Sequence, residues 1–131
     1  MTSVDVVQQV AVVAPRGDLC HVEMGEVARA ISDLVRQGDV RVVLDLRAVD
    51  HVNFTILPAL VNSRSRLRAL GGDLCIAAAS DYVIKIFRFA GVHEHFQVYE
   101  DLQDALDSFA VLETQATVSA GQSRSWVPKL R

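Results

Sequence analysis

The stretch VVLDLRAVDHVNFTILPALVNSRSRLRALGGDLCIAAA, residues 42–79, decides the fold of this chain. Apolar runs at residues 40–46 and 74–78 flank a helical segment that stops at two consecutive glycines. Runs of Val, Leu and Ile that are almost uninterrupted predict strands covered on both faces, as in a parallel sheet. The stretch therefore predicts a strand, a short loop at residues 50–55, a helix over about 55–70 and a second strand.

The same alternation of strand and helix continues on both sides of this stretch. Apolar residues at helical spacing predict amphipathic helices, and short β-rich segments between turn residues predict strands. The alternation implies right-handed crossovers and an α/β fold, with a small mainly parallel sheet, an antiparallel first strand unit and about four helices. The further predicted segments are a hairpin or one bent strand over 4–14, a turn at 15–18, helices over 21–37, over 82–90 and from 101, and a short strand over 96–99.

Length and composition fit one domain at residues 1–113, followed by a small, polar C-terminal tail at 114–131 that we expect to be flexible. Trp126 in this tail suits docking onto a partner or onto the domain itself. Half of the residues are apolar, but no run reaches the roughly 18–20 apolar residues of a membrane span. The N-terminus also lacks the basic start and apolar run of a signal peptide. We therefore expect a cytoplasmic protein without direct membrane insertion.

The charge of the chain argues against nucleic acid as a partner. The net charge is −3, so no bulk attraction draws the protein to a phosphate backbone. The arginines at alternate positions 64, 66 and 68 of the second predicted helix point in different directions. We expect them to be a scattered, solvated set rather than a basic patch.

The residue types offer little support for catalysis or for a bound cofactor. Two cysteines make no disulfide framework, and His93-Glu94-His95 is an incomplete set of metal ligands. Asp45 and Asp50 flank a strand end, where α/β sheets place their chemistry, yet the sequence has no Gly-rich phosphate loop and no nucleophile elbow. We predict no enzyme activity, no metal and no cofactor. A small enzyme or nucleotide binder on a flavodoxin-like sheet is a third alternative.

Three segments carry a resemblance to a known family. Residues 42–52 form an apolar strand that ends in an aspartate and a short turn, residues 70–74 form a helix stop before the next strand, and residues 80–92 form a helix that ends in a Gly-hydrophobic pair. In this order they resemble the STAS domain, the fold of anti-sigma-factor antagonists, over residues 4–112. The resemblance implies a bacterial protein-binding module in signal transduction and transcription regulation, whose partner is an anti-sigma kinase or a similar signalling protein.

The loop before the second predicted helix departs from the family pattern. In the family this loop often contains Asp-Ser-Ser/Thr-Gly, and the first serine is phosphorylated by the partner kinase. The matching residues here are Asn53-Phe54-Thr55-Ile56, and phenylalanine cannot accept a phosphoryl group. The family's kinase-controlled release therefore does not carry over. Thr55 is the remaining candidate phosphoacceptor, because a helix N-terminus favours the negative charge of a phosphate.

The same loop can be interpreted from its residue types alone. Asn53 and Thr55 are both good N-caps for the following helix. With Asn53 as the cap, Pro58 would fall in the second turn, where it loses a hydrogen bond and clashes with the preceding turn. With Thr55 as the cap, Pro58 falls in the first turn at little cost, so the sequence favours Thr55. Phe54 either points outward as an apolar anchor or folds inward over the sheet.

We predict a non-enzymatic protein-protein interaction module whose surface combines this loop with the start of the 82–90 helix, capped by Ser80 and Asp81. Lys85 and Phe89 fall off the inward stripe of that helix, and Phe89 either extends the surface or packs inward. The alternative function is a STAS-like adaptor subunit of an ABC-type membrane transport complex, bound to the transporter ATPase, which requires no phosphoserine. The predicted partner-binding residues are Asn53, Phe54, Thr55, Ile56, Leu57, Ser80, Asp81 and Tyr82.

Overall fold

The computed structural model describes residues 2–118, and the side chains of residues 2–110, as an α/β fold. The predicted tail from residue 119 onward, with Trp126, lies outside the described residues, and the predicted domain boundary at residue 113 falls within the last helix. Within residues 2–118, none of the helices combines the length and the apolar content needed to cross a membrane.

The elements are β1 Ser3–Val7, β2 Val10–Ala14, β3 Gly17–Leu19, α1 His21–Arg36, β4 Arg41–Asp45, β5 Val49–Val52, the 3₁₀ helix η1 Phe54–Ile56, α2 Leu57–Ala69, β6 Asp73–Ala77, α3 Asp81–Phe89, the 3₁₀ helix η2 His93–His95, β7 Val98–Tyr99 and α4 Leu102–Val118.

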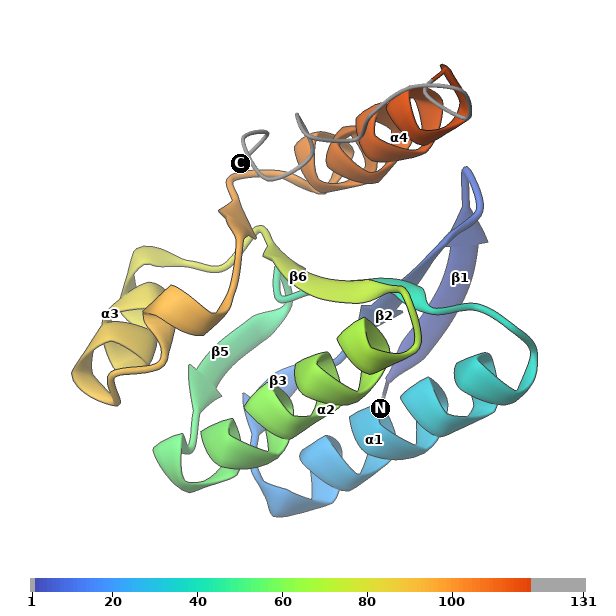
Figure 1. The fold of residues 1–131 in the computed structure, drawn as a ribbon. Helices are drawn as coiled ribbons and strands as arrows, with labels where there is room; N and C mark the ends of the chain where they lie inside the picture. The colour runs from blue at the N-terminus through green and yellow to red at the C-terminus, as the bar shows by residue number, and fades with distance from the viewer. Residues whose placement is uncertain (1, 119–131) are drawn as a thin grey trace.

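The main sheet contains five strands in the order β1-β2-β4-β6-β7. The pairs β2–β4, β4–β6 and β6–β7 are parallel, whereas β1 and β2 are antiparallel. Helices α1 and α2 cover one face of this sheet and α4 covers the other, while α3 lies beside β5 (Figure 1). This arrangement confirms the predicted α/β fold with a mainly parallel sheet and an antiparallel first strand unit.

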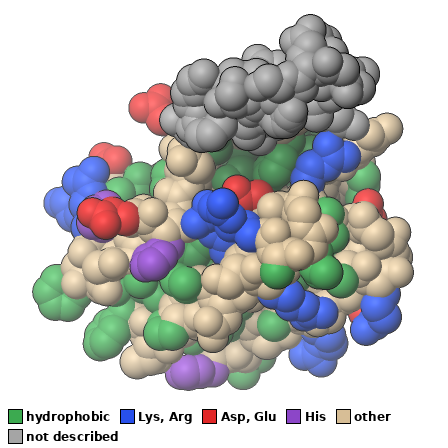
Figure 2. Space-filling model, in the orientation of Figure 1, with side chains coloured by type: hydrophobic (Ala, Val, Ile, Leu, Met, Phe, Trp, Pro, Cys, Tyr) green, Lys and Arg blue, Asp and Glu red, His purple; other side chains and the backbone are tan. Residues whose placement is uncertain are grey.

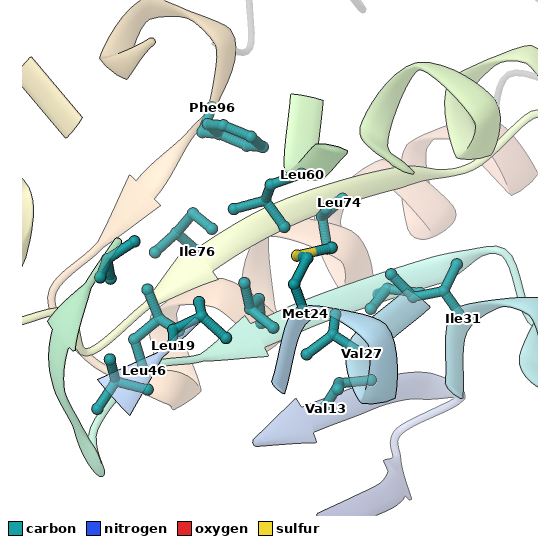
Figure 3. Close-up of a cluster of buried hydrophobic side chains, with 14 of the residues drawn as sticks. Val13, Leu19, Met24, Val27, Ile31, Leu46, Leu60, Leu74, Ile76 and Phe96 are labelled. Carbon is teal, nitrogen blue, oxygen red and sulfur yellow. The ribbon is translucent and has the colours of Figure 1, made fainter. Parts of the chain in front are cut away.

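The side chains of the central strand β4 alternate between the two faces of the sheet. Val42 and Leu44 belong to the core cluster under α1 and α2, which also contains Val27 and Leu60 (Figure 3). Val43 belongs to the second cluster, under α4. Burying an aliphatic side chain of this kind contributes about 1.5–3 kcal/mol. Burial on both faces explains why β4 and β6 are apolar almost throughout.

Strands β1 and β2 form a hairpin, which decides between the two alternatives that the sequence left open. Gln8 and Gln9 at its turn have φ angles of 55° and 67°. Positive φ at both central residues is the mark of a type I′ turn, whose twist suits a hairpin. Glutamine does not favour this region of backbone space, so the residue types themselves do not indicate the turn.

A second sheet, formed by the short parallel strands β3 and β5, was not predicted. These strands occupy parts of the predicted turn and of the predicted loop, and both predictions are wrong to that extent. Leu19 pairs with Val52 across the two strands. In β5 only Val49 and Val52 are buried, and the exposed Asp50 and His51 lie between them. Neither an alternating pattern nor a continuous apolar run therefore marks this strand.

The double glycine between α2 and β6 allows the chain to turn directly from the helix into the sheet. Gly71 has a φ of 90°, in the left-handed region that commonly ends a helix. A Cβ atom on Gly72 would collide with the carbonyl group of Val40. The N–H of Asp73 donates to that same carbonyl at 3.0 Å, so β6 begins directly beside the residue that precedes β4.

Arg64 on α2 is partly buried and bonded within the protein, which corrects the expectation for this one of the three arginines. Its Nε atom lies 2.8 Å from Oδ1 of Asp73, and its Nη1 atom lies 2.5 Å from the carbonyl oxygen of His95. Arg66 and Arg68 are exposed, as expected. Arg64 therefore connects α2 to the start of β6 and to η2.

Candidate protein-binding site

The loop after β5 forms one turn of 3₁₀ helix, η1, before α2 begins at Leu57. Oδ1 of Asn53 accepts hydrogen bonds from the Thr55 N–H at 2.9 Å and from the Thr55 hydroxyl at 2.7 Å. Asn53 is thus the cap of this segment, and the predicted N-cap role of Thr55 is wrong. Pro58 does fall in the first turn of α2, but the preceding 3₁₀ turn moves the cap upstream to Asn53.

Thr55 also contacts the first residue of α1. Its Oγ1 atom lies 3.1 Å from Nε2 of His21. Because the hydroxyl has a single hydrogen and donates it to Asn53, its oxygen accepts from His21, which places a hydrogen on Nε2. These contacts fix the loop against α1. Thr55 is exposed with its hydroxyl engaged in both hydrogen bonds, and its role as a phosphoacceptor stays a prediction.

The predicted binding residues around the loop tip divide between surface and core. Phe54 is 56% exposed, so it takes the outward orientation of the two that the sequence left open. Ile56 and Leu57 are 1% and 0% exposed and belong to the core cluster under α1 and α2. Their side chains are buried and cannot contact a partner, and their packing anchors the 3₁₀ turn to the core.

The N-terminal part of α3 supplies the second half of the predicted surface. Oγ of Ser80 accepts a hydrogen bond from the Val83 N–H at 3.1 Å, which confirms the predicted N-cap. Asp81 in the first turn is exposed, and Tyr82 is 53% exposed. Phe89 at the end of the helix is 85% exposed, so the alternative in which it packs inward is wrong. Two aromatic side chains of α3 therefore face outward.

His51, which is not among the predicted site residues, joins the two halves of the site. Its Nδ1 atom lies 2.8 Å from the hydroxyl oxygen of Tyr82, and the two ring centroids are 5.7 Å apart. The contact connects β5 to α3, which pack against each other. Only the unpredicted strand β5 places His51 beside Tyr82, so no local signal could have revealed this contact.

A groove of about 420 Å³ lies between helix α3 and the segment from His51 to Phe54. We call it the aromatic groove. In Figure 2, hydrophobic side chains gather at the lower left of the view, where Figure 1 places α3 and the start of α2. Lys85 brings a cation to the groove and His51 an imidazole, and none of the described residues that line it is a carboxylate. The lining residues are His51, Val52, Asn53, Phe54, Tyr82, Lys85, Ile86 and Phe89.

The other polar residues that the sequence singled out lie outside the aromatic groove. Asp45 is nearly buried, and its Oδ1 atom accepts a hydrogen bond from the Arg47 N–H at 3.0 Å, as a turn residue would. His93 and His95 lie in η2. Among the residues whose side chains are described, no group of three His, Cys, Asp or Glu could hold a metal ion.

Cys75 on β6 is a buried thiol rather than a reactive one. Burial raises the pKa of this thiol to about 12, and the negative charge of Asp73 acts in the same direction. Arg64 opposes this rise in the pKa. Because the thiolate is the nucleophilic form, a thiol with so high a pKa is inert near neutral pH.

Comparison with known proteins agrees with this architecture. The family model of the STAS domain matches residues 2–105. Among curated proteins, none matches the sequence. An anti-sigma factor antagonist from Mycobacterium paratuberculosis is a similar solved structure, with 25% identity and a TM-score of 0.72 over 82% of this chain and 92% of that chain. The anti-sigma factor antagonist SpoIIAA in its unphosphorylated form has 21% identity and a TM-score of 0.70 over 84% of this chain and 96% of that chain. A sulfate transporter family protein from Wolinella succinogenes has 19% identity and a TM-score of 0.68 over 84% of this chain and 92% of that chain. Since the family model covers most of the chain, this chain belongs to the STAS domain family.

Proposed function

We propose that this chain is a non-enzymatic interaction module of the anti-sigma-factor-antagonist type, which binds a regulatory kinase or a related signalling protein. The observation that carries the proposal is that Phe54 and Tyr82, from segments far apart in the sequence, are both half-exposed and line the same groove. Exposed aromatic side chains beside a groove are the residues that most often dominate the energy of a protein interface. The binding surface comprises Asn53, Phe54 and Thr55 together with Ser80, Asp81 and Tyr82.

Control of this binding differs from a serine-based switch, because Phe54 occupies the position at which the family carries its acceptor serine. Binding is therefore constitutive or controlled at another residue. Thr55 is the candidate for such control, since a phosphate on its hydroxyl would disrupt the hydrogen bonds to Asn53 and His21. Incubation with the captured kinase and ATP, followed by mass spectrometry of wild type and Thr55→Val, tests this. Phosphate found only on another residue would remove Thr55 as the acceptor.

A second candidate function is an adaptor subunit of a membrane transport complex that contacts a transporter ATPase. The observation that favours it is the similarity in fold to the sulfate transporter family protein from Wolinella succinogenes. This function would use the same exposed surface and would require no phosphorylation. The identity of the captured partner separates the two candidates.

The experiment is a pull-down from a lysate of the source cells with three immobilised proteins: wild type, Phe54→Asp and Leu70→Asp. Leu70 is a matched control, because it is about as exposed as Phe54 but lies at the far end of α2. We expect wild type and Leu70→Asp to retain a partner that Phe54→Asp loses, since a buried unpaired charge opposes binding. Mass spectrometry then identifies a kinase-like protein or a transporter ATPase. Equal capture by all three proteins would remove this loop as the binding site.

A further inference from the structure

We propose that the aromatic groove holds a short amphipathic helix of the protein partner, which presents apolar side chains to the groove and a carboxylate to Lys85. This inference rests on the proposed function and extends the binding surface beyond the predicted residues, along α3 as far as Phe89. Three properties of the groove support it: its direction, its exposed apolar side chains and its charge.

The direction of the groove follows the axis of α3. Tyr82, Lys85, Ile86 and Phe89 stand at i, i+3, i+4 and i+7, so they form one stripe along that helix. With a rise of about 1.5 Å per residue, the stripe is about 10 Å long. The opposite wall is the segment from His51 to Phe54. A groove bounded by a helical stripe suits a second helix that contributes side chains at the same spacing, the helix-in-groove mode of peptide recognition.

The groove exposes large apolar side chains, which a protein partner would cover on binding. Phe89 is the most exposed of the large apolar residues whose side chains are described, and Tyr82 and Phe54 are more than half exposed. Isolated exposed apolar residues are common, but three that line one concave surface mark an interaction site. The volume of about 420 Å³ accommodates a few side chains rather than the surface of a whole domain.

The charge of the groove is opposite in sign to that of the chain. Among the described residues that line the groove, Lys85 is the one charged side chain and none is a carboxylate, although the net charge of the chain is −3. A ligand that combines apolar side chains with one carboxylate would therefore bind in a single orientation, with the carboxylate at Lys85. A lysine in the same place of the ligand would be repelled.

The test uses three synthetic peptides of about 16 residues, long enough to be helical when rich in alanine. The first carries leucines at i, i+3, i+4 and i+7 with one flanking glutamate, the second has lysine in place of that glutamate, and the third has serines in place of the leucines. Binding of each labelled peptide is measured by fluorescence anisotropy against wild type, Phe89→Ser, Lys85→Glu and the remote control Leu70→Ser. All substituted residues are exposed, so these variants keep the fold, which circular dichroism verifies.

We expect wild type and Leu70→Ser to bind the acidic peptide about tenfold more tightly than the basic one, and the serine peptide not at all. Phe89→Ser weakens the binding of the acidic peptide by at least about tenfold, as loss of an interface anchor does. Lys85→Glu reverses the preference between the acidic and basic peptides. Equal binding of these two peptides to wild type, or undiminished binding to Phe89→Ser, would overturn the inference.

The same variants separate this inference from the proposed function. A partner captured in a Phe54-dependent manner that still binds Phe89→Ser and Lys85→Glu would leave the proposed function standing and overturn the groove assignment. Charge-selective peptide binding without any captured partner would support the groove assignment and count against the proposed signalling partner. Self-association of wild type in analytical ultracentrifugation, abolished by Phe89→Ser, would show that a second copy covers the groove and would overturn the inference.

Discussion

The Nδ1 atom of His51 lies 2.8 Å from the hydroxyl oxygen of Tyr82, and this contact joins the two walls of the aromatic groove. His51 belongs to β5, in the small second sheet, whereas Tyr82 belongs to α3. The rings are tilted by 30° with their centroids 5.7 Å apart, so the pair combines a hydrogen bond with ring contact. The two walls of the groove are therefore linked by a contact between two exposed side chains.

We expect the His51–Tyr82 pair to show a measurable coupling in a double-mutant cycle with His51→Ala and Tyr82→Phe. The hydrogen bond is solvent-exposed, so the coupling should be small, about 0.5–1 kcal/mol. Urea unfolding of wild type, both single variants and the double variant measures it. A cycle of His51→Ala with Phe89→Ser is the control and should be additive, because no hydrogen bond links those two residues. Coupling of equal size in both cycles would contradict a specific contact.

The cap of η1 can be tested by separating Asn53 from Thr55. Asn53→Ala removes the acceptor of both hydrogen bonds from Thr55 and should cost about 1 kcal/mol of unfolding free energy. Asn53→Asp keeps an acceptor and should cost less. Thr55→Ala keeps the backbone bond to Asn53, so we expect a smaller loss than for Asn53→Ala. A larger loss for Thr55→Ala, measured by urea unfolding, would restore Thr55 as the cap.

The strands of the main sheet could be predicted because their signal is local. Val42, Val43 and Leu44 are buried on one face or the other, so the run is apolar without a break. Strand β5 has no such signal, since it is held by pairing with β3, a segment that precedes α1. Short strands that depend on a distant partner cannot be identified from their own residues.

The candidate site could be predicted only where a residue acts on its own segment. Ser80 was identified as a cap, because the capped N–H lies three residues away. The His51–Tyr82 contact across the groove was not predicted, because it depends on how β5 packs against α3. Ile56 and Leu57 are among the predicted binding residues, but they are buried because the turn that carries Phe54 outward packs these two side chains into the core under α1 and α2. Arg64 was assigned to solvent because its partners, Asp73 and His95, follow α2 in the sequence.

Arg64 should contribute more to stability than the other arginines of α2. Arg64→Ala removes a partly buried ion pair with Asp73 and an exposed hydrogen bond to the His95 carbonyl. Hydrogen bonds to charged groups contribute about 1.5–3 kcal/mol, so we expect a loss in this range. Arg66→Ala is the matched control, because it removes only an exposed contact with Ser32 and should cost less than about 1 kcal/mol. Equal losses of unfolding free energy would contradict a connecting role for Arg64.

Substitutions in the β1–β2 turn should raise the free energy of unfolding. Gln8 and Gln9 both have positive φ, a conformation that costs a residue with a side chain about 1–2 kcal/mol relative to its preferred backbone. Replacing them by Asn-Gly, the pair that type I′ turns prefer, should raise the unfolding free energy by about 0.5–1 kcal/mol. Gln8→Pro should do the opposite, because proline fixes φ near −65°. Destabilisation by Asn-Gly in thermal unfolding would show that the turn has a different geometry in solution.

Cys75 should make the stability of the protein depend on pH in the alkaline range. Burial, with a smaller contribution from Asp73, raises the pKa of the thiol from an ordinary value of 9.0 to about 12. Above the ordinary value, the thiol of the unfolded chain loses its proton while the folded thiol keeps it. The unfolded state then binds fewer protons, so stability falls as pH rises from about 9 to about 12, and it is independent of this group at lower pH.

The measurement compares Cys75 with Cys75→Ala, both in a Cys20→Ser background that leaves one thiol to titrate. We expect the difference in unfolding free energy between the two proteins to be constant at about pH 7–8. Above about pH 9 it should fall with a slope of at most about 1.4 kcal/mol per pH unit, the value for one proton. Urea unfolding at several pH values measures this difference, and titration of the remaining groups cancels between the two proteins. A difference that stays constant up to about pH 10.5 would mean that Cys75 titrates normally and that water reaches β6 from the α4 side of the sheet.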